Sequence, residues 1–384
     1  MQVKQIYALV NDATKEVLGE TALVNEDLSN LVEIGDAITN VGGVDNYVKA
    51  LVDRIGKVIF VNRAYAGKVP SVLRDSWEFG SILQKVSAIL PDADENETWK
   101  LVHGASYDPN IYYEPTVEVS YFNGKVTFEI DLSFTSIQVK ESFTSASAMN
   151  GFISMLYNEV DKSMTVKIDS LVMKTIANAI GDTFYDEFPG GTYTGVTSVK
   201  AVNLLKEYND AFGTSLTSAA AITNKDFLRF AAIKIGIVSE RLTAMSKLFN
   251  IGDKARFTPK DLQHIVLLAD FAKGVEGYMQ SDTFHDDLVQ LPKYETVPYW
   301  QGSGTSFAWG AIDAIDVTTK AGHTVTPTGI LGVIFDHDAI AVCNQDRRVL
   351  TQFNPKGEFY TNFYKFDCEF INAQDENFVV FYVA

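Results

Sequence analysis

The spacing of apolar residues divides the chain into helical, extended and irregular stretches. Between Leu28 and Ile38 apolar residues recur every three or four positions, which predicts an amphipathic helix in an N-terminal arm. Residues 62–112 carry little helical periodicity but many glycines, prolines and aromatic side chains. A stretch of about 50 such residues is long for an idle connection, so it indicates a functional segment.

A hairpin and a long helix are predicted next. Apolar and polar residues alternate over 117–121 and again over 126–130, on either side of Asn123-Gly124. Asn-Gly is a preferred pair for a type I′ turn, so the pattern predicts a β-hairpin. An apolar stripe over 142–180 then predicts either one long helix with a break near Asp161 or two stacked helices, and Gly181 is expected to follow the last turn.

The second half of the chain predicts a compact α/β module followed by a β-rich tail. Helical stripes cover 199–208 and 226–249. The tail, 354–384, holds two apolar runs, and an apolar terminal strand needs a partner strand to cover its edge. Short apolar runs predict strands at 265–268, 296–300, 330–335 and 340–343.

Composition and charge exclude several classes of protein for this chain. The chain has 384 residues, is 46% hydrophobic and carries a net charge of −17, so it is globular and its surface repels nucleic acid phosphates. Two cysteines, Cys343 and Cys368, are too few for a disulfide framework. No secretory signal or 18-residue apolar run is visible, so we expect a reducing cytosol and no membrane.

Motifs for catalysis, cofactors and metals are mostly missing. The sequence holds no phosphate-binding glycine loop, no GxSxG and no HExxH. Residues 92–103 begin like a calcium loop but have Glu97 in place of the glycine and His103 in place of the bidentate glutamate. We therefore expect no cofactor and no metal.

Two histidine clusters remain as candidate chemistry. Asp336-His337-Asp338 and His285-Asp286-Asp287 each offer a base with carboxylates or part of a metal site. We favour a polar turn for the first, because it lies between two predicted strands. Cys343 is more typical of a small buried side chain than of a nucleophile.

Several short motifs occur in a characteristic order. They are LVDRIG at 51–56, GVIFDHD at 332–338, NPKG at 354–357, FYTNFY at 359–364 and NFVVF at 377–381. Together they resemble the major capsid proteins of small, short-tailed phages of the picovirus type, which are podoviruses with a Hong-Kong-97-type fold. Lys356 and Cys368 depart from the family pattern.

The resemblance implies an α+β, HK97-like capsid fold and a structural role without enzymatic activity. Copies of the chain would form the hexamers and pentamers of an icosahedral head around double-stranded DNA. Scaffolding protein and portal would be partners during assembly in the host bacterial cytoplasm, and packaged DNA would be touched only weakly. The implied parts are an N-terminal arm (1–56), an extended loop (57–114), a peripheral domain (115–195 and 346–384) with a spine helix (142–180), and an axial domain (196–345).

The same resemblance implies contacts between copies. Buried aromatic side chains dominate interface energies, so aromatics of the extended loop and the tail are the candidates. Arg347-Arg348 suits an interface ion pair, and the tail aromatics favour core or subunit contact over base stacking. The tail is expected to return and pair with strands near 115–135. The candidate contacts are Trp77, Phe79, Trp99, Tyr112, Arg347, Arg348, Phe359 and Tyr360.

Two alternatives stay open from the sequence. The first is an encapsulin-like nanocompartment shell, which uses the same fold and encloses enzymes instead of DNA. The second is a cytosolic hydrolase that uses Asp336-His337-Asp338.

Overall fold

The computed structural model divides into two compact units, each described by itself. Unit 1 holds residues 1–78, 125–172 and 342–369, and unit 2 holds residues 79–124, 173–341 and 370–384. The structure describes residues 3–19, 30–40, 69–74, 83–89, 100–114, 116–135, 146–282, 292–300, 315–319 and 322–384, together with residues 25, 47 and 91.

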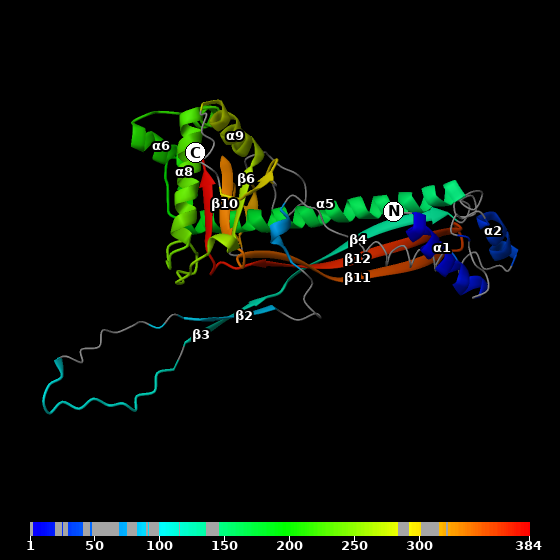
Figure 1. The fold of residues 1–384 in the computed structure, drawn as a ribbon, viewed down its shortest axis with the longest axis horizontal. Helices are drawn as coiled ribbons and strands as arrows, with labels where there is room; N and C mark the ends of the chain where they lie inside the picture. Colours follow the sequence, from blue (N-terminus) through cyan, green and yellow to red (C-terminus); the bar gives the residue numbers. More distant parts are fainter. Residues whose placement is uncertain are drawn as a thin grey trace. The chain divides into compact units, whose positions relative to one another are not determined.

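Unit 1 is built on a four-stranded sheet (Figure 1). The strand order is β1-β11-β12-β4, and β1 runs parallel to β11. The expected N-terminal helix is present as α2, which buries Ile34 and Ile38. The elements are α1 (Val3–Leu18), α2 (Leu31–Asn40), a 3-10 turn (Pro70–Val72), β1 (Leu73–Arg74), most of β4 (Gly124–Thr135), β11 (Ile340–Asn354) and β12 (Phe359–Asn372), and the first part of α5.

Cross-strand polar pairs fix the register of β4 against β12. Thr127 donates to Asp367 (Oγ1 to Oδ1, 2.7 Å), and Glu129 pairs with Lys365 at 2.8 Å. The partner numbers run in opposite directions, as they do in antiparallel strands. Lys125–Glu369 (2.9 Å) and Ser133–Thr361 (3.0 Å) continue the series.

Unit 2 is built on a five-stranded sheet in the order β5-β13-β10-β6-β7. Strand β10 is antiparallel to β13 and β6, while β13 is parallel to β5 and β6 to β7. The elements are β5 (Ala201–Asn203), α6 (Leu204–Phe212), α7 (Ser218–Ala221), α8 (Lys225–Leu242), a 3-10 turn (Lys260–Leu262), β6 (Gln263–Leu268), α9 (Ala269–Asp282), β7 (Glu295–Val297), β8 (Val317–Thr318), β9 (Thr324–Val325), β10 (Ile330–Asp336) and β13 (Phe378–Tyr382).

The central strands of unit 2 are the ones that the apolar runs predicted. Every residue of β10 and of β13 is buried, as is typical of strands with a neighbour on each side. The terminal strand therefore has the cover that its composition demands. The tail expectation is correct for β12, which pairs with β4, and wrong for β13, which pairs with β10 and β5. The wholly apolar run of β13 suits a central position, whereas β12 alternates between buried and half-buried side chains.

The predicted hairpin at Asn123-Gly124 is wrong. Among the described strands, β3 (Val117–Phe122) pairs with β2 (Leu83–Ala88), and β4 pairs with β12. Gly124 does not have the positive φ that a type I′ turn needs. A Cβ at Gly124 would lie 2.9 Å from the ring of Phe370, so the glycine is needed for close packing.

A long helix is present, but the break expected near Asp161 is absent and its predicted end is wrong. Helix α5 runs from Ala146 to Glu187, past Gly181. A Cβ at Gly181 would lie 2.1 Å from Cγ2 of Val317, so this glycine lets β8 approach the helix instead of ending it. Similarly, α8 ends at Leu242, earlier than the predicted 249. None of the described helices is long and apolar enough to cross a bilayer.

Candidate interaction site

An antiparallel two-stranded ribbon in unit 2 carries exposed apolar side chains. Strands β2 and β3 pair from Leu83 opposite Phe122 to Ala88 opposite Val117. Side chains on both strands are exposed, including Val86 at 60% and Tyr121 at 65%. A lone two-stranded ribbon is marginally stable in water, so this one needs support from elsewhere.

The loop that joins the two strands is solvent-exposed wherever it is described. All residues of 100–114 are exposed, and Tyr112 and Tyr113 reach 82% and 80%. Single exposed apolar side chains are ordinary, but a run of them marks an interaction surface. The run contains Leu101, Val102, Tyr107, Ile111, Tyr112 and Tyr113.

The root of the ribbon is held by a group of charged side chains, here called the root cluster: Lys85, Glu118, Lys254, Arg256, Asp375 and Glu376. Lys85 of β2 reaches the turn before β13, where its Nζ lies 2.5 Å from Glu376 and 3.2 Å from Asp375. The three side chains are only 11–20% exposed. Little solvent screens these pairs, so they are stronger than surface ion pairs.

The second strand of the ribbon is held in the same way. Glu118 of β3 pairs with Lys254 at 2.5 Å. Arg256 lies 3.4 Å from Asp375 and 3.3 Å from Glu376, so these two carboxylates face both Arg256 and Lys85. Both strands are thereby connected to the loop that follows α8.

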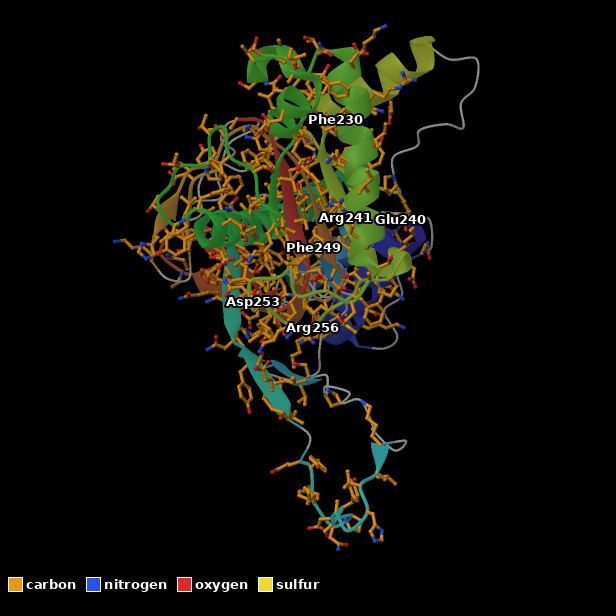
Figure 2. The ribbon with its side chains drawn as sticks, turned by 90° about the vertical axis from the view of Figure 1, so that its left-hand side faces the viewer. Phe230, Glu240, Arg241, Phe249, Asp253 and Arg256 are labelled. Carbon is orange, nitrogen blue, oxygen red and sulfur yellow. The ribbon has the colours of Figure 1, made fainter. Side chains whose placement is uncertain are left out.

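Local hydrogen bonds fix the loop that carries Lys254 and Arg256. Asn250 accepts from the backbone N–H of Lys254 and donates to its carbonyl, each at 2.8 Å. Ser246 and Arg256 exchange backbone hydrogen bonds at 2.9 and 3.0 Å. Figure 2 shows Asp253 and Arg256 on this loop, beside the start of the ribbon. The cations are therefore held in place by the backbone.

Burial affects the charge of Glu376. Burial raises the pKa of this carboxyl, and the nearby cations Lys85 and Arg256 only partly oppose the rise. The ionised form of Glu376 is therefore net unfavourable in the fold even though it is paired. Such a cluster specifies where the ribbon lies more than it stabilises the protein.

The pKa of Glu376 leads to a pH-dependent prediction. Because the pKa is raised in the fold, the favourable contribution of protonated Glu376 is complete below its unfolded value and is lost as the pH rises through its folded value. We expect the unfolding free energy of the wild type to fall relative to that of Glu376→Gln over this window, measured by urea unfolding at several pH values. Glu114→Gln controls for the loss of one carboxylate. A wild-type stability that rose relative to the variant would contradict the prediction.

Several of the residues singled out from the sequence lie outside the described residues. These are Trp77, Phe79, Trp99, the calcium-like acidic residues 92–97 and His285-Asp286-Asp287; the side chain of Arg347 is also not described. Of the tail residues, Tyr360 is 2% exposed and packs against Phe134 and Phe353 inside unit 1, so it offers no surface to a second copy. Phe359 is half-buried.

The structure places Arg348 in an ion pair within its own unit. Its guanidinium donates to Asp367 at 2.9 and 3.3 Å. Of the predicted contact residues that the structure describes, Tyr112 is the one that lies exposed on the loop between the ribbon strands.

The Asp336-His337-Asp338 segment is the predicted turn between β10 and β11. The Asp336 carboxylate accepts from Thr258 at 2.7 Å and from the backbone N–H of Asp338 at 2.8 Å, so it serves the fold. His337 lies 2.9 Å from His264 through ring nitrogens. No group of three or more metal-ligating side chains occurs within the described ranges. Cys343 is buried, as expected of a small core side chain.

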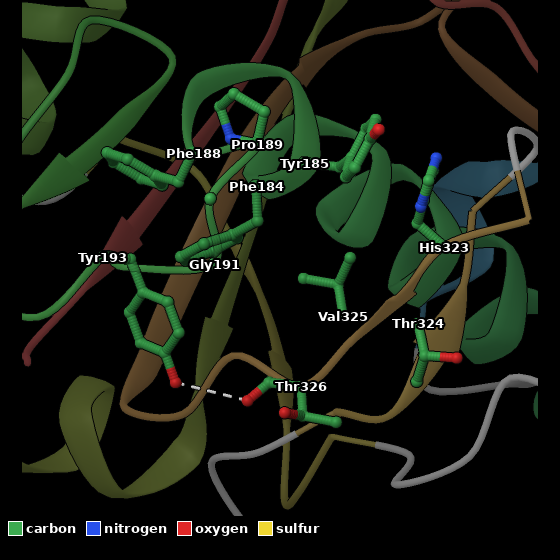
Figure 3. A pocket seen from close by; sticks show the side chains of 11 residues that line it. Phe184, Tyr185, Phe188, Pro189, Gly191, Tyr193, His323, Thr324, Val325 and Thr326 are labelled. Carbon is green, nitrogen blue, oxygen red and sulfur yellow. Dashed lines mark hydrogen bonds between the residues drawn. The ribbon is translucent and has the colours of Figure 1, made fainter.

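A small cavity lies at the end of α5 in unit 2 (Figure 3). Its volume is about 320 Å³, and its lining includes the aromatic residues Phe184, Tyr185, Phe188 and Tyr193. Tyr193 closes one side by donating to the carbonyl of Thr326 at 3.2 Å, so its hydroxyl is satisfied by the backbone. Tyr185 stacks on His323 at 4.4 Å between ring centroids, which joins α5 to the segment before β9.

Sequence analysis missed the root cluster. Its members are separated by up to 291 residues, as in the Lys85–Glu376 pair. Lys85 lies within residues 62–112, where the sequence predicts no regular element. No periodicity links Lys85 to a turn near the end of the chain.

Comparisons with known proteins bear on these observations. A search of curated protein sequences found no match. Among solved structures, the capsid structure of Staphylococcus phage Andhra matches with 8% identity and a TM-score of 0.50, covering 84% of this chain and 86% of that one. A structure of the head fibre and inner core protein gp22 of native bacteriophage P68 matches with 8% identity and a TM-score of 0.51, covering 83% and 85%.

The structural matches support the HK97-like α+β capsid fold. A sequence profile gives the family directly. The profile of the Phi29-like phage major capsid proteins matches residues 8–382, nearly the whole chain. The expected structural, non-enzymatic role as a subunit of a phage capsid is thereby confirmed, and neither the nanocompartment nor the hydrolase alternative is favoured. The chain belongs to the Phi29-like phage major capsid protein family.

Proposed function

We propose that copies of this chain form the hexamers and pentamers of an icosahedral head around double-stranded DNA, and that the β2–β3 ribbon is the arm by which each copy holds its neighbour. The observation that carries the arm's role is the contrast between its two ends. The loop 100–114 is fully exposed, while Lys85 at the root is held by two carboxylates. An arm that is fixed at its root and uncovered at its tip suits a contact with another molecule.

The energetics favour contacts that are weak one by one. A standard interface buries about 1,600 Å², and most of its gross apolar gain is offset by lost freedom and desolvation. Because each copy has several neighbours in a shell, the small surplus of each contact adds up. The exposed tyrosines of the loop supply the anchors that such contacts need.

We also propose the remaining parts and partners from the family resemblance. The axial domain comprises 196–345, and the peripheral domain comprises 115–195 and 346–384 with α5 as its spine. Scaffolding protein and portal take part in assembly in the bacterial cytoplasm. The net charge of −17 supports only weak, non-specific contact with DNA.

Shortening the loop tests the role of the arm. Joining Ala88 to Val117 by Asn-Gly removes residues 89–116 and leaves a tight hairpin, since these two residues already pair. We expect the subunit to keep its thermal unfolding temperature to within about 2 °C, because every residue of 100–114 is exposed and contributes little to the core. We expect no closed shells in negative-stain images of protein co-expressed with its assembly factors.

Ser106→Ala, in the same exposed loop, is the control and should form shells as the wild type does. Normal shells from the shortened chain would exclude the ribbon as the arm. A wild-type protein that stayed monomeric with all its assembly factors would exclude shell formation itself.

A further inference from the structure

Helix α8 carries an exposed stripe that its own chain does not use. Arg229, Ile233, Ile237 and Arg241 are spaced four residues apart and therefore share one face of the helix. All four are exposed, with Ile233 at 44% and Ile237 at 37%. The opposite face of α8 is buried in unit 2 by Phe227, Leu228, Ala231, Ala232, Ile235, Val238 and Leu242.

The two arginines of the stripe are available to bind another molecule. Across the described residues, neither Arg229 nor Arg241 makes an ion pair, whereas Glu240 beside them pairs with Lys260. Figure 2 shows Glu240 and Arg241 on α8. Four other basic side chains of residues 225–261, which are Lys234, Lys254, Arg256 and Lys260, pair with carboxylates, so the two arginines stand out as cations that remain for another molecule.

The exposed loop of the ribbon has the complementary pattern. Asp108 and Glu114 flank Ile111, Tyr112 and Tyr113, and all five are exposed. Within the described part of the chain, neither carboxylate forms an ion pair; Asp108 accepts only the backbone N–H of Asn110, at 2.9 Å. The loop thus offers two anions around an apolar and aromatic centre.

The two patterns agree in length. Twelve residues along α8 separate Arg229 from Arg241, which is about 18 Å along the helix axis. Six residues separate Asp108 from Glu114, which span at most about 20 Å. Arginine also pairs well with carboxylates and stacks on tyrosine rings.

The two surfaces do not cover each other within one copy. Tyr112 and Tyr113 are at least 80% exposed, and Ile233 and Ile237 are exposed as well, in the same chain. A contact between the two patterns therefore requires a second copy.

We propose that the loop segment 108–114 of one copy docks along the α8 stripe of a neighbouring copy, with Asp108 and Glu114 facing the two arginines and the tyrosines covering the isoleucines. The inference rests on the proposed role of the ribbon as the arm and names the surface that receives it. DNA is the less suitable occupant, because two exposed isoleucines gain nothing from phosphates.

A charge swap between copies tests the docking. We expect Arg229→Glu/Arg241→Glu and Asp108→Lys/Glu114→Lys each to lower the yield of shells by about tenfold or more, because like charges then face each other. A chain that carries all four changes should restore shells, since the lysines of each loop then face the glutamates of each neighbouring stripe. Lys247→Glu/Lys293→Glu, which makes the same change of charge at two exposed positions off the stripe, should assemble normally.

Each other outcome overturns the docking. Normal shells from Arg229→Glu/Arg241→Glu would exclude α8 as the receiving surface, and normal shells with less packaged DNA would assign the stripe to the genome. A chain with all four changes that folds but forms no shells would exclude the pairing of these charges. Thermal unfolding of each variant confirms that it folds. A wild type without shells would reject the proposed function as well, so the two failures differ.

Discussion

Replacing Lys85 with methionine is expected to lower the free energy of unfolding by about 1–3 kcal/mol and to lower shell yield further than this loss of stability explains. The substitution keeps the length of the side chain but leaves Asp375 and Glu376 with Arg256 as their cation. Because burial already raises the pKa of Glu376, its ionised form is net unfavourable in the fold, and the loss of Lys85 makes it more so. The ribbon then loses the contact that fixes its first strand, so its tip reaches neighbours less often.

Urea unfolding and negative-stain counts of shells measure the two effects of Lys85→Met. Lys206→Met is the matched control, since it removes a pair with Asp210 whose partners are 38% and 60% exposed. Exposed pairs of this kind contribute less than about 0.5 kcal/mol. A Lys85 variant that matched the Lys206 variant in both measurements would show that the root cluster does not position the ribbon.

Gly329→Ala is expected to destabilise unit 2 by about 3 kcal/mol or more. Gly329 has a φ of +74°, where a side chain is strained, and its Cβ would lie 2.0 Å from the carbonyl oxygen of Val383. The carbonyl of Gly329 also accepts the N–H of Val383 at 2.9 Å, so the clash separates the start of β10 from the end of β13.

Thermal unfolding measures the effect of Gly329→Ala. Gly190→Ala is the matched control, because a Cβ there meets nothing within 4 Å and the residue is exposed. Equal unfolding temperatures for the two variants would contradict this, because they would mean that the backbone near Val383 moves to accommodate the added methyl group without a loss of stability.

The sequence was most informative where one residue pattern allowed one structure. The apolar run 330–335 became a wholly buried central strand because it has no polar side to expose. The alternating tail became β12, whose buried side chains alternate with half-buried ones. Both results follow from local spacing, and packing did not override them.

Sequence patterns failed where distant contacts decided the outcome. Asn123-Gly124 has the composition of a hairpin turn, but the ring of Phe370 occupies the space beside Gly124 and the chain continues into another sheet. Gly181 has the composition of a helix end, but Val317 explains its missing side chain. The root cluster joins residues from three regions of the chain, and charge alone does not pair Lys85 with Glu376.

The position of β13 in its sheet sets the order in which a copy matures on the ribosome. Residues 378–382 are inserted between β10 and β5, so these two strands have no common neighbour until β13 has been translated. A product that stops before Phe378 leaves two apolar strand edges uncovered and cannot complete its sheet. Such a truncated product is therefore expected to aggregate through these edges.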